Sequence, residues 1–212
     1  MDKINLFPVS IYSFNNDTLD NDKLISLLDD ETFGEHNALS SIDNLHVKDQ
    51  FCGLFNWINS CLNMLKDDHK YDCDMLEISS SWANKYYRNS DMYHAPHRHS
   101  MSLWSGIYYL TEGAPTVFED PVFQRTHAQI EVLQHEFSPF YRINPEPGKL
   151  ILFPSWMYHS TMPNFDDTDR YTISFNVLPT GKINYNLARD SIAVIKLEST
   201  IKKDFFEEQT ND

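Results

Sequence analysis

The fold of this chain is decided by residues 149–177, which read KLILFPSWMYHSTMPNFDDTDRYTISFNV. Two runs within this stretch, Lys149–Phe153 and Arg170–Val177, are rich in β-branched and aromatic residues, as strands are. Proline, asparagine and aspartate fill the connection between them and predict turns. We therefore expect two strands joined by an irregular, turn-rich segment.

The same texture extends from Asp74 to about Pro179, where short aromatic and β-branched runs alternate with glycine, proline and asparagine clusters. This pattern is typical of a sandwich or of a barrel-like jelly roll. Further strands are expected at Met75–Tyr87, Trp104–Thr111, Thr116–Glu119, Ile130–Leu133 and Phe140–Ile143. The fold class that follows is mainly β.

The segments outside this β region predict flanking elements. An edge strand is expected at Leu6–Phe14, which carries a proline near its start. Apolar residues recur at helical spacing in Asp20–Asp30 and in Val47–Leu65, and they predict two N-terminal helices. The polar stretch Glu31–Asn44 between these helices is expected to be a loop. Gly181–Asp212 is expected to form a peripheral helix and a frayed tail.

Length and composition favour one soluble domain. The chain has 212 residues, enough for one sizeable core, and we assign residues 1–180 to a single domain and 181–212 to a peripheral segment. It has neither an apolar run that could cross a membrane nor a readable signal peptide, which favours a cytoplasmic location. Three cysteines at Cys52, Cys61 and Cys73 fit neither a disulfide framework nor a zinc site.

The charge of the chain argues against some partners. A formal net charge of -14 repels phosphate groups at long range, so we expect no binding to nucleic acid or to an anionic membrane. A basic protein or a small molecule fits this charge better as a partner. Association into a homodimer is left open.

Histidines are clustered in a way that suggests a metal site. His94, His97 and His99 lie within six residues, and His159 follows far downstream. Side chains two apart leave a strand on the same face, so His97 and His99 can point into one cavity. A third imidazole from a distant strand would complete one face of an octahedron and leave positions open for a cosubstrate and dioxygen. The competing interpretation is a set of solvated histidines in a polar loop.

A candidate anion site follows His159 in the sequence. Arg170, Thr172 and Ser174 alternate along one expected strand, so all three share a face. A guanidinium binds a carboxylate through two parallel hydrogen bonds, and neighbouring hydroxyls supply further donors. This combination inside a barrel predicts a carboxylate anchor.

These motifs together resemble the iron(II) and 2-oxoglutarate-dependent dioxygenases, in particular a bacterial and phage branch with a prolyl-hydroxylase-like core. The resemblance covers roughly Leu76–Leu178 and rests on SSSWANKYYRNSDMYHAPHRHSMSLWSGIYYL, FEDP, INPEPGKLILFPSWMYHSTMPN and DRYTISFNV. It implies a double-stranded β-helix of the cupin-like kind, Fe(II) and 2-oxoglutarate as cofactors, and a cytoplasmic or virus-encoded enzyme. The implied reaction hydroxylates a peptide residue or a small molecule and yields succinate and CO2.

The resemblance also implies roles for individual residues. His97 begins the metal motif, and His159 is the distal metal histidine. Arg170 binds the far carboxylate of 2-oxoglutarate, assisted by Tyr109 and Ser174.

One position departs from the pattern of the superfamily, which places Asp or Glu two residues after the first histidine. Here that residue is His99. Either three histidines hold the metal, or a carboxylate arrives from elsewhere, with Glu119 and Asp120 as the nearest candidates in the motifs. Strand alternation favours His99. His94 is expected to lie behind the ligands, to face the substrate, or to be exposed.

The absence of the acidic ligand supports a second hypothesis, a cupin-like protein that binds or senses a metal without catalysis. A third hypothesis is another three-histidine enzyme, such as a thiol dioxygenase, which would not need the pocket around Arg170. Near the metal motif, Tyr86, Tyr87 and Tyr93 are expected as exposed aromatics at a loop mouth. Gln124–Pro139 is expected to be a mobile insertion beside the site.

Overall fold

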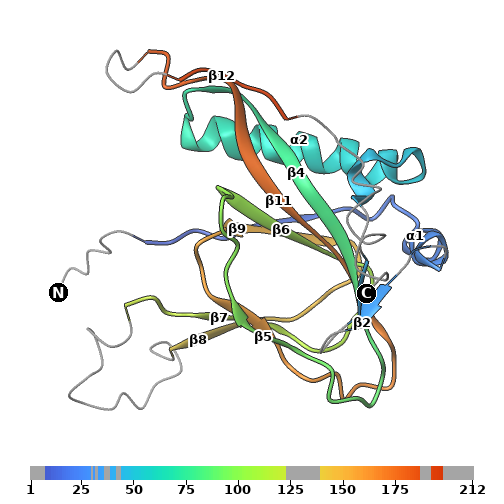
Figure 1. Cartoon of the computed structure of the whole chain (residues 1–212). Coiled ribbons are helices and arrows are strands. Elements are labelled where there is room, and N and C mark those ends of the chain that lie inside the picture. Colours follow the sequence, from blue (N-terminus) through green and yellow to red (C-terminus); the bar gives the residue numbers. More distant parts are fainter. Residues whose placement is uncertain are drawn as a thin grey trace, which may run out of the picture.

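The computed structural model describes residues 8–29, 31, 33–35, 39–41, 44–122, 139–186 and 192–197. Within these residues two antiparallel sheets face each other, the arrangement of a double-stranded β-helix (Figure 1). The larger sheet has the order β1 (Tyr12–Asn15), β9 (Lys149–Pro154), β6 (Trp104–Tyr109), β11 (Arg170–Ile183), β4 (Cys73–Tyr86), β3 (Leu39–Ser41) and β2 (Phe33–Glu35), with β12 (Ile192–Ile195) paired to β11. The smaller sheet has the order β5 (His94–His97), β10 (His159–Thr161), β7 (Thr116–Glu119) and β8 (Phe140–Ile143).

Two helices cover the outer face of the larger sheet. They are α1 (Asn21–Leu28) and α2 (Cys52–His69), and short 3-10 turns η1 (Leu45–Val47) and η2 (Asp49–Phe51) lead into α2. Helix α2 packs against β4, and Figure 1 shows it crossing that strand. The main hydrophobic core lies between these layers and includes Leu54, Ile58, Leu62, Tyr108, Leu152, Ile173 and Phe175.

A second, smaller core fills the space between the two sheets. Strand β9 contributes to both cores, because Leu150 and Leu152 face the helices while Ile151 and Phe153 face inward. Burial on both faces explains why this strand is a continuous apolar run rather than an alternating one. The inner core occupies one part of the barrel, and the polar residues described below occupy another.

Most of the elements expected from the sequence are confirmed. The mainly β fold with N-terminal helices is present, and β1 is an edge strand as expected. The expected loop at Glu31–Asn44 is wrong, because it contains β2 and β3, which extend the larger sheet from β4. The peripheral helix expected after Gly181 is also wrong for the described residues, since β11 continues to Ile183 and β12 pairs with it. The expected strand Ile130–Leu133 and nearly all of the expected insertion Gln124–Pro139 lie outside the described residues.

Cys52, Cys61 and Cys73 are all free. Among the described helices, none has the length and apolar character needed to cross a membrane.

Candidate active site

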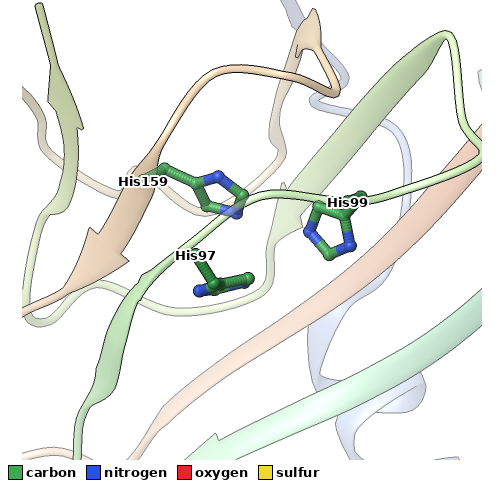
Figure 2. A group of neighbouring side chains, drawn as sticks. All are labelled: His97, His99 and His159. Carbon is green, nitrogen blue, oxygen red and sulfur yellow. The ribbon is translucent and has the colours of Figure 1, made fainter. Parts of the chain in front are cut away.

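Three histidines from two strands and a loop converge between the sheets. His97 ends β5 and His159 begins β10, and the two residues are register partners in the antiparallel ladder. Their ring centroids lie 4.4 Å apart, and His99 lies 5.2 Å from each. One potential ligand atom from each ring lies within 4.8 Å of the others. Figure 2 shows the three rings around one common space.

His99 reaches this cluster for a reason different from the expected one. Strand β5 ends at His97, so His99 belongs to the loop that follows and does not alternate along a strand. Its backbone N–H donates to the carbonyl of Ser155, 3.0 Å away, in the connection between β9 and β10. This bond fastens the His99 loop to the segment that leads to His159.

Hydrogen bonds select the ring nitrogens that face the common space. Nδ1 of His97 donates to the carbonyl of Ala95 over 2.8 Å, and Nδ1 of His159 donates to the carbonyl of Met157 over 3.1 Å. A proton on Nδ1 leaves the lone pair on Nε2, which is the form that binds a metal. Two of the three imidazoles are therefore held in a metal-binding tautomer by the backbone.

Burial keeps two of the three imidazoles, His99 and His159, uncharged. Burial, together with the neighbouring His97, lowers the pKa of His159 to about 3 and the pKa of His99 to about 4. Both imidazoles are therefore uncharged near neutral pH, as ligands to a divalent cation must be.

The two carboxylates considered as alternative ligands lie elsewhere. Among the described residues, the only cluster suited to a metal consists of the three histidines. Glu119 and Asp120 line a separate groove together with Val9, Ile11 and Tyr141. Neither carboxylate belongs to the three-histidine cluster, so this geometry favours three histidines as the ligands.

His94 lies beside the cluster without belonging to it. Its ring centroid is 5.8 Å from that of His97. In the ladder, His97 pairs with His159 and His94 pairs with Thr161. Strand β5 therefore has one residue more than β10 between these two pairs, which is a β-bulge. This bulge turns His94 toward the same interior although it stands three residues before His97.

Arg170 lies in the same cavity and is almost completely buried, with 1% of its surface exposed. Its Nε donates to the carbonyl of Ala114 over 2.9 Å, and Nη2 lies 3.5 Å from Oγ1 of Thr116. Within the described part of the chain, no carboxylate pairs with this guanidinium. A buried cation without a counter-ion is costly, so the geometry suits an anionic ligand.

Hydroxyl and amide groups continue from Arg170 along the cavity wall. Thr172 and Ser174 line the cavity on the same face of β11 as Arg170. Nδ2 of Asn84 donates to Ser174 Oγ over 3.0 Å and lies 3.4 Å from Thr172 Oγ1. Sequence reasoning missed Asn84, although its place on β4 opposite Thr172 follows once the strands are paired.

Two tyrosines face the guanidinium. Tyr109 is fully buried, its ring centroid is 5.7 Å from Cζ of Arg170, and its hydroxyl donates to Thr116 Oγ1 over 2.8 Å. Tyr86 was expected to be exposed at a loop mouth, which is wrong, because it ends β4 and packs 4.7 Å from the same Cζ. Tyr87 and Tyr93 are exposed, as expected.

The residues present fit a divalent metal and a dicarboxylate. Neutral imidazoles supply nitrogen ligands of the kind that Fe(II) accepts. The unpaired guanidinium and its hydroxyl neighbours supply the donors that a carboxylate requires. Both sets line one cavity between the sheets, so a single small diacid can contact both.

Comparison with protein families agrees with this arrangement. The fold and the donor set define a double-stranded β-helix with a candidate metal site between its sheets. Residues 80–176 match the model of the family described as "Putative 2OG-Fe(II) oxygenase". The matched segment contains every histidine of the cluster and Arg170. No curated protein matches the chain.

Solved structures share the fold at low sequence identity. The collagen prolyl hydroxylase of Paramecium Bursaria Chlorella virus-1 is 12% identical, with a TM-score of 0.53 over 79% of this chain and 94% of that one. A prolyl-4-hydroxylase of Pseudomonas putida is 11% identical, with a TM-score of 0.55 over 82% and 94%. HygX of Streptomyces hygroscopicus, solved with nickel, 2-oxoglutarate and hygromycin B, is 10% identical, with a TM-score of 0.55 over 81% and 84%.

Proposed function

We propose that this protein is an Fe(II)- and 2-oxoglutarate-dependent hydroxylase that acts on a peptide residue or a small molecule and releases succinate and CO2. The observation that carries the proposal is the pairing, in one cavity, of a three-histidine cluster with a buried guanidinium that has no carboxylate partner among the described residues. A protein that only stored or sensed a metal would have no use for that guanidinium.

The metal would be held by His97, His99 and His159 through one nitrogen each. When bound, the iron supplies the oxidising chemistry, in which dioxygen and 2-oxoglutarate are consumed together. The task of the protein is to orient the three rings and to keep those of His99 and His159 neutral. The backbone carbonyls of Ala95 and Met157 support this by fixing the tautomers of His97 and His159.

The cosubstrate would be held at its far end by Arg170. The Ala114 carbonyl accepts a hydrogen bond from Nε of Arg170, and the Thr116 hydroxyl accepts one from Nη2. These two bonds fix the plane of the guanidinium. Thr172 and Ser174 provide hydroxyl groups along the same wall, and the ring of Tyr109 packs against the guanidinium of Arg170. A preorganised guanidinium loses little conformational freedom when a carboxylate binds.

The class of substrate follows from the relatives. Two of the similar structures are named as prolyl hydroxylases, one of them a viral collagen prolyl hydroxylase, and HygX was solved with the small molecule hygromycin B. Both classes remain candidates for this chain. We also propose a cytoplasmic location, which the three free cysteines support.

Anaerobic titration tests the proposed function. Fe(II) protein is mixed with increasing 2-oxoglutarate, and a metal-to-ligand charge-transfer band is expected in the visible. On admission of air, succinate should form in an Fe(II)-dependent manner. The absence of a band at any concentration would contradict the proposal.

Two variants separate the two halves of the site. Arg170→Gln keeps the metal cluster, so it should bind Fe(II) normally and lose the band at concentrations that saturate the wild type. His97→Ala should lose Fe(II) itself. A band of unchanged affinity in Arg170→Gln would show that the cosubstrate binds elsewhere.

A further inference from the structure

Tyr86 connects the anion end of the cavity to a fourth histidine. It lies opposite Arg170 in the β4–β11 ladder, and its ring covers the guanidinium at 4.7 Å. At the other end of the side chain, the Tyr86 hydroxyl is hydrogen-bonded to Nδ1 of His94 and lies 3.4 Å from Oγ1 of Thr161. The ring that covers the guanidinium is therefore held at its tip by His94.

His94 contacts the metal end of the cavity as well. Its ring lies edge-on to Tyr86, with centroids 5.5 Å apart and planes at 73°, and 5.8 Å from the ring of His97. It nevertheless lies outside the cluster of potential metal ligands. The bulge in β5 is what brings His94 to this position between the two halves of the site.

We propose that His94 is a positioning residue for the cosubstrate, acting through the Tyr86 hydroxyl to fix the aromatic wall against which Arg170 presents its guanidinium. The ring of a tyrosine rotates over a broad range of χ2 unless its surroundings hold it. Burial raises the pKa of Tyr86, so the hydroxyl stays neutral and keeps this bond. A guanidinium held against a fixed ring offers a carboxylate one geometry instead of several. This inference rests on the proposed function.

The test compares the affinity of the anaerobic Fe(II) protein for 2-oxoglutarate, read from the charge-transfer band, in four variants and the wild type. His94→Ala and Tyr86→Phe should each raise the Kd about tenfold, the effect of losing one buried hydrogen bond. The Kd of the double variant should also rise about tenfold and not about a hundredfold, because both changes remove the same hydrogen bond. His94→Asn keeps a hydrogen-bonding group at the δ position and should stay within about twofold of the wild type.

A parallel measurement of Fe(II) affinity, by competition with a chelator, should give the same value for His94→Ala and the wild type. A loss of Fe(II) affinity as large as that of His97→Ala would make His94 a ligand and overturn the inference. An unchanged Kd for 2-oxoglutarate in His94→Ala, or a hundredfold loss in the double variant, would also overturn it while the wild-type band upholds the proposed function. If the wild type itself gives no band, both proposals fail. Should His94→Ala not fold, Tyr86→Phe and His94→Asn carry the same comparison.

Discussion

At the scale of single residues, the site depends on which nitrogen of each imidazole carries the proton. His97 and His159 both donate from Nδ1 to the carbonyl two residues earlier, so each ligand is oriented by its own local backbone. His99 is oriented through its backbone N–H, which binds Ser155. The spacing of His97 and His99 suggested their proximity, but the sequence could not reveal that a loop, and not a strand, brings His99 in.

His99 stands where the superfamily usually has an acidic ligand, and substitutions of His99 give the first prediction. His99→Ala should lower Fe(II) affinity by at least about tenfold, because metal sites lose that much even when only an outer partner of a ligand is removed. His99→Asp provides a carboxylate ligand in place of the imidazole, so this variant should retain Fe(II). Equilibrium competition with a chelator measures both. If His99→Ala binds Fe(II) as the wild type does, the metal site does not include His99.

The pKa values of two ligands predict how stability of the metal-free protein depends on pH. His99 and His159 have pKa values of about 4 and about 3 in the folded chain, below the ordinary value of 6.5. Unfolded chains therefore bind more protons below pH 6.5, and the free energy of unfolding should fall as the pH drops from there through about 4 to about 3. Urea unfolding at several pH values measures this. His159→Gln should flatten the dependence, and an unchanged slope in that variant would contradict the assignment.

At the scale of elements, the regular strands could be predicted and the short polar ones could not. Strands β9 and β11 are continuous runs of β-branched and aromatic residues, which is a strong signal. Strands β5 and β10 read HAPH and HST, carry the metal candidates, and lack such a run. Tertiary pairing alone makes them strands. Strand β5 contains a bulge, and its Pro96 supplies no backbone N–H. Because of this bulge, the position of His94 could not be predicted from strand alternation.

The packing of β6 against β11 gives a prediction of its own. A Cβ at Gly106 would stand 2.2 Å from the ring of Phe175, which is fully buried, so Gly106→Ala should destabilise the fold by about 1–3 kcal/mol through overpacking. Gly53→Ala is the control, because Gly53 lies in α2 with nothing within 4 Å of the added atom. It should stabilise the chain by about 0.5–1 kcal/mol. Thermal or urea unfolding compares them, and equal effects of the two changes would contradict the packing described.

At the scale of the whole molecule, the two-sheet fold places an anion site and a metal site at neighbouring positions in one interior. The chain has a formal net charge of -14, yet its interior holds a guanidinium that pairs with no carboxylate of the described residues. The sequence allowed Arg170, Thr172 and Ser174 to be placed on one face, since β11 is regular there. It could not show that Asn84 and Tyr86 complete the same wall, because that depends on the register between β4 and β11.

Because binding at this site involves both sheets, ligands should stabilise the entire fold. With Mn(II) as a redox-inactive stand-in for iron, 2-oxoglutarate at about 100 times its Kd should add about 2.7 kcal/mol to the free energy of unfolding. The increase in Tm should be absent in Arg170→Gln, whose cavity lacks the guanidinium. An equal increase in that variant would mean that 2-oxoglutarate stabilises the protein from another site.

The most direct test is a crystal structure of the anaerobic protein with Fe(II) and 2-oxoglutarate. We predict one metal ion bound by His97, His99 and His159, with 2-oxoglutarate on the same ion and its far carboxylate on Arg170. A metal bound by fewer than these three imidazoles, or a 2-oxoglutarate whose far carboxylate lies away from Arg170, would contradict the proposed site.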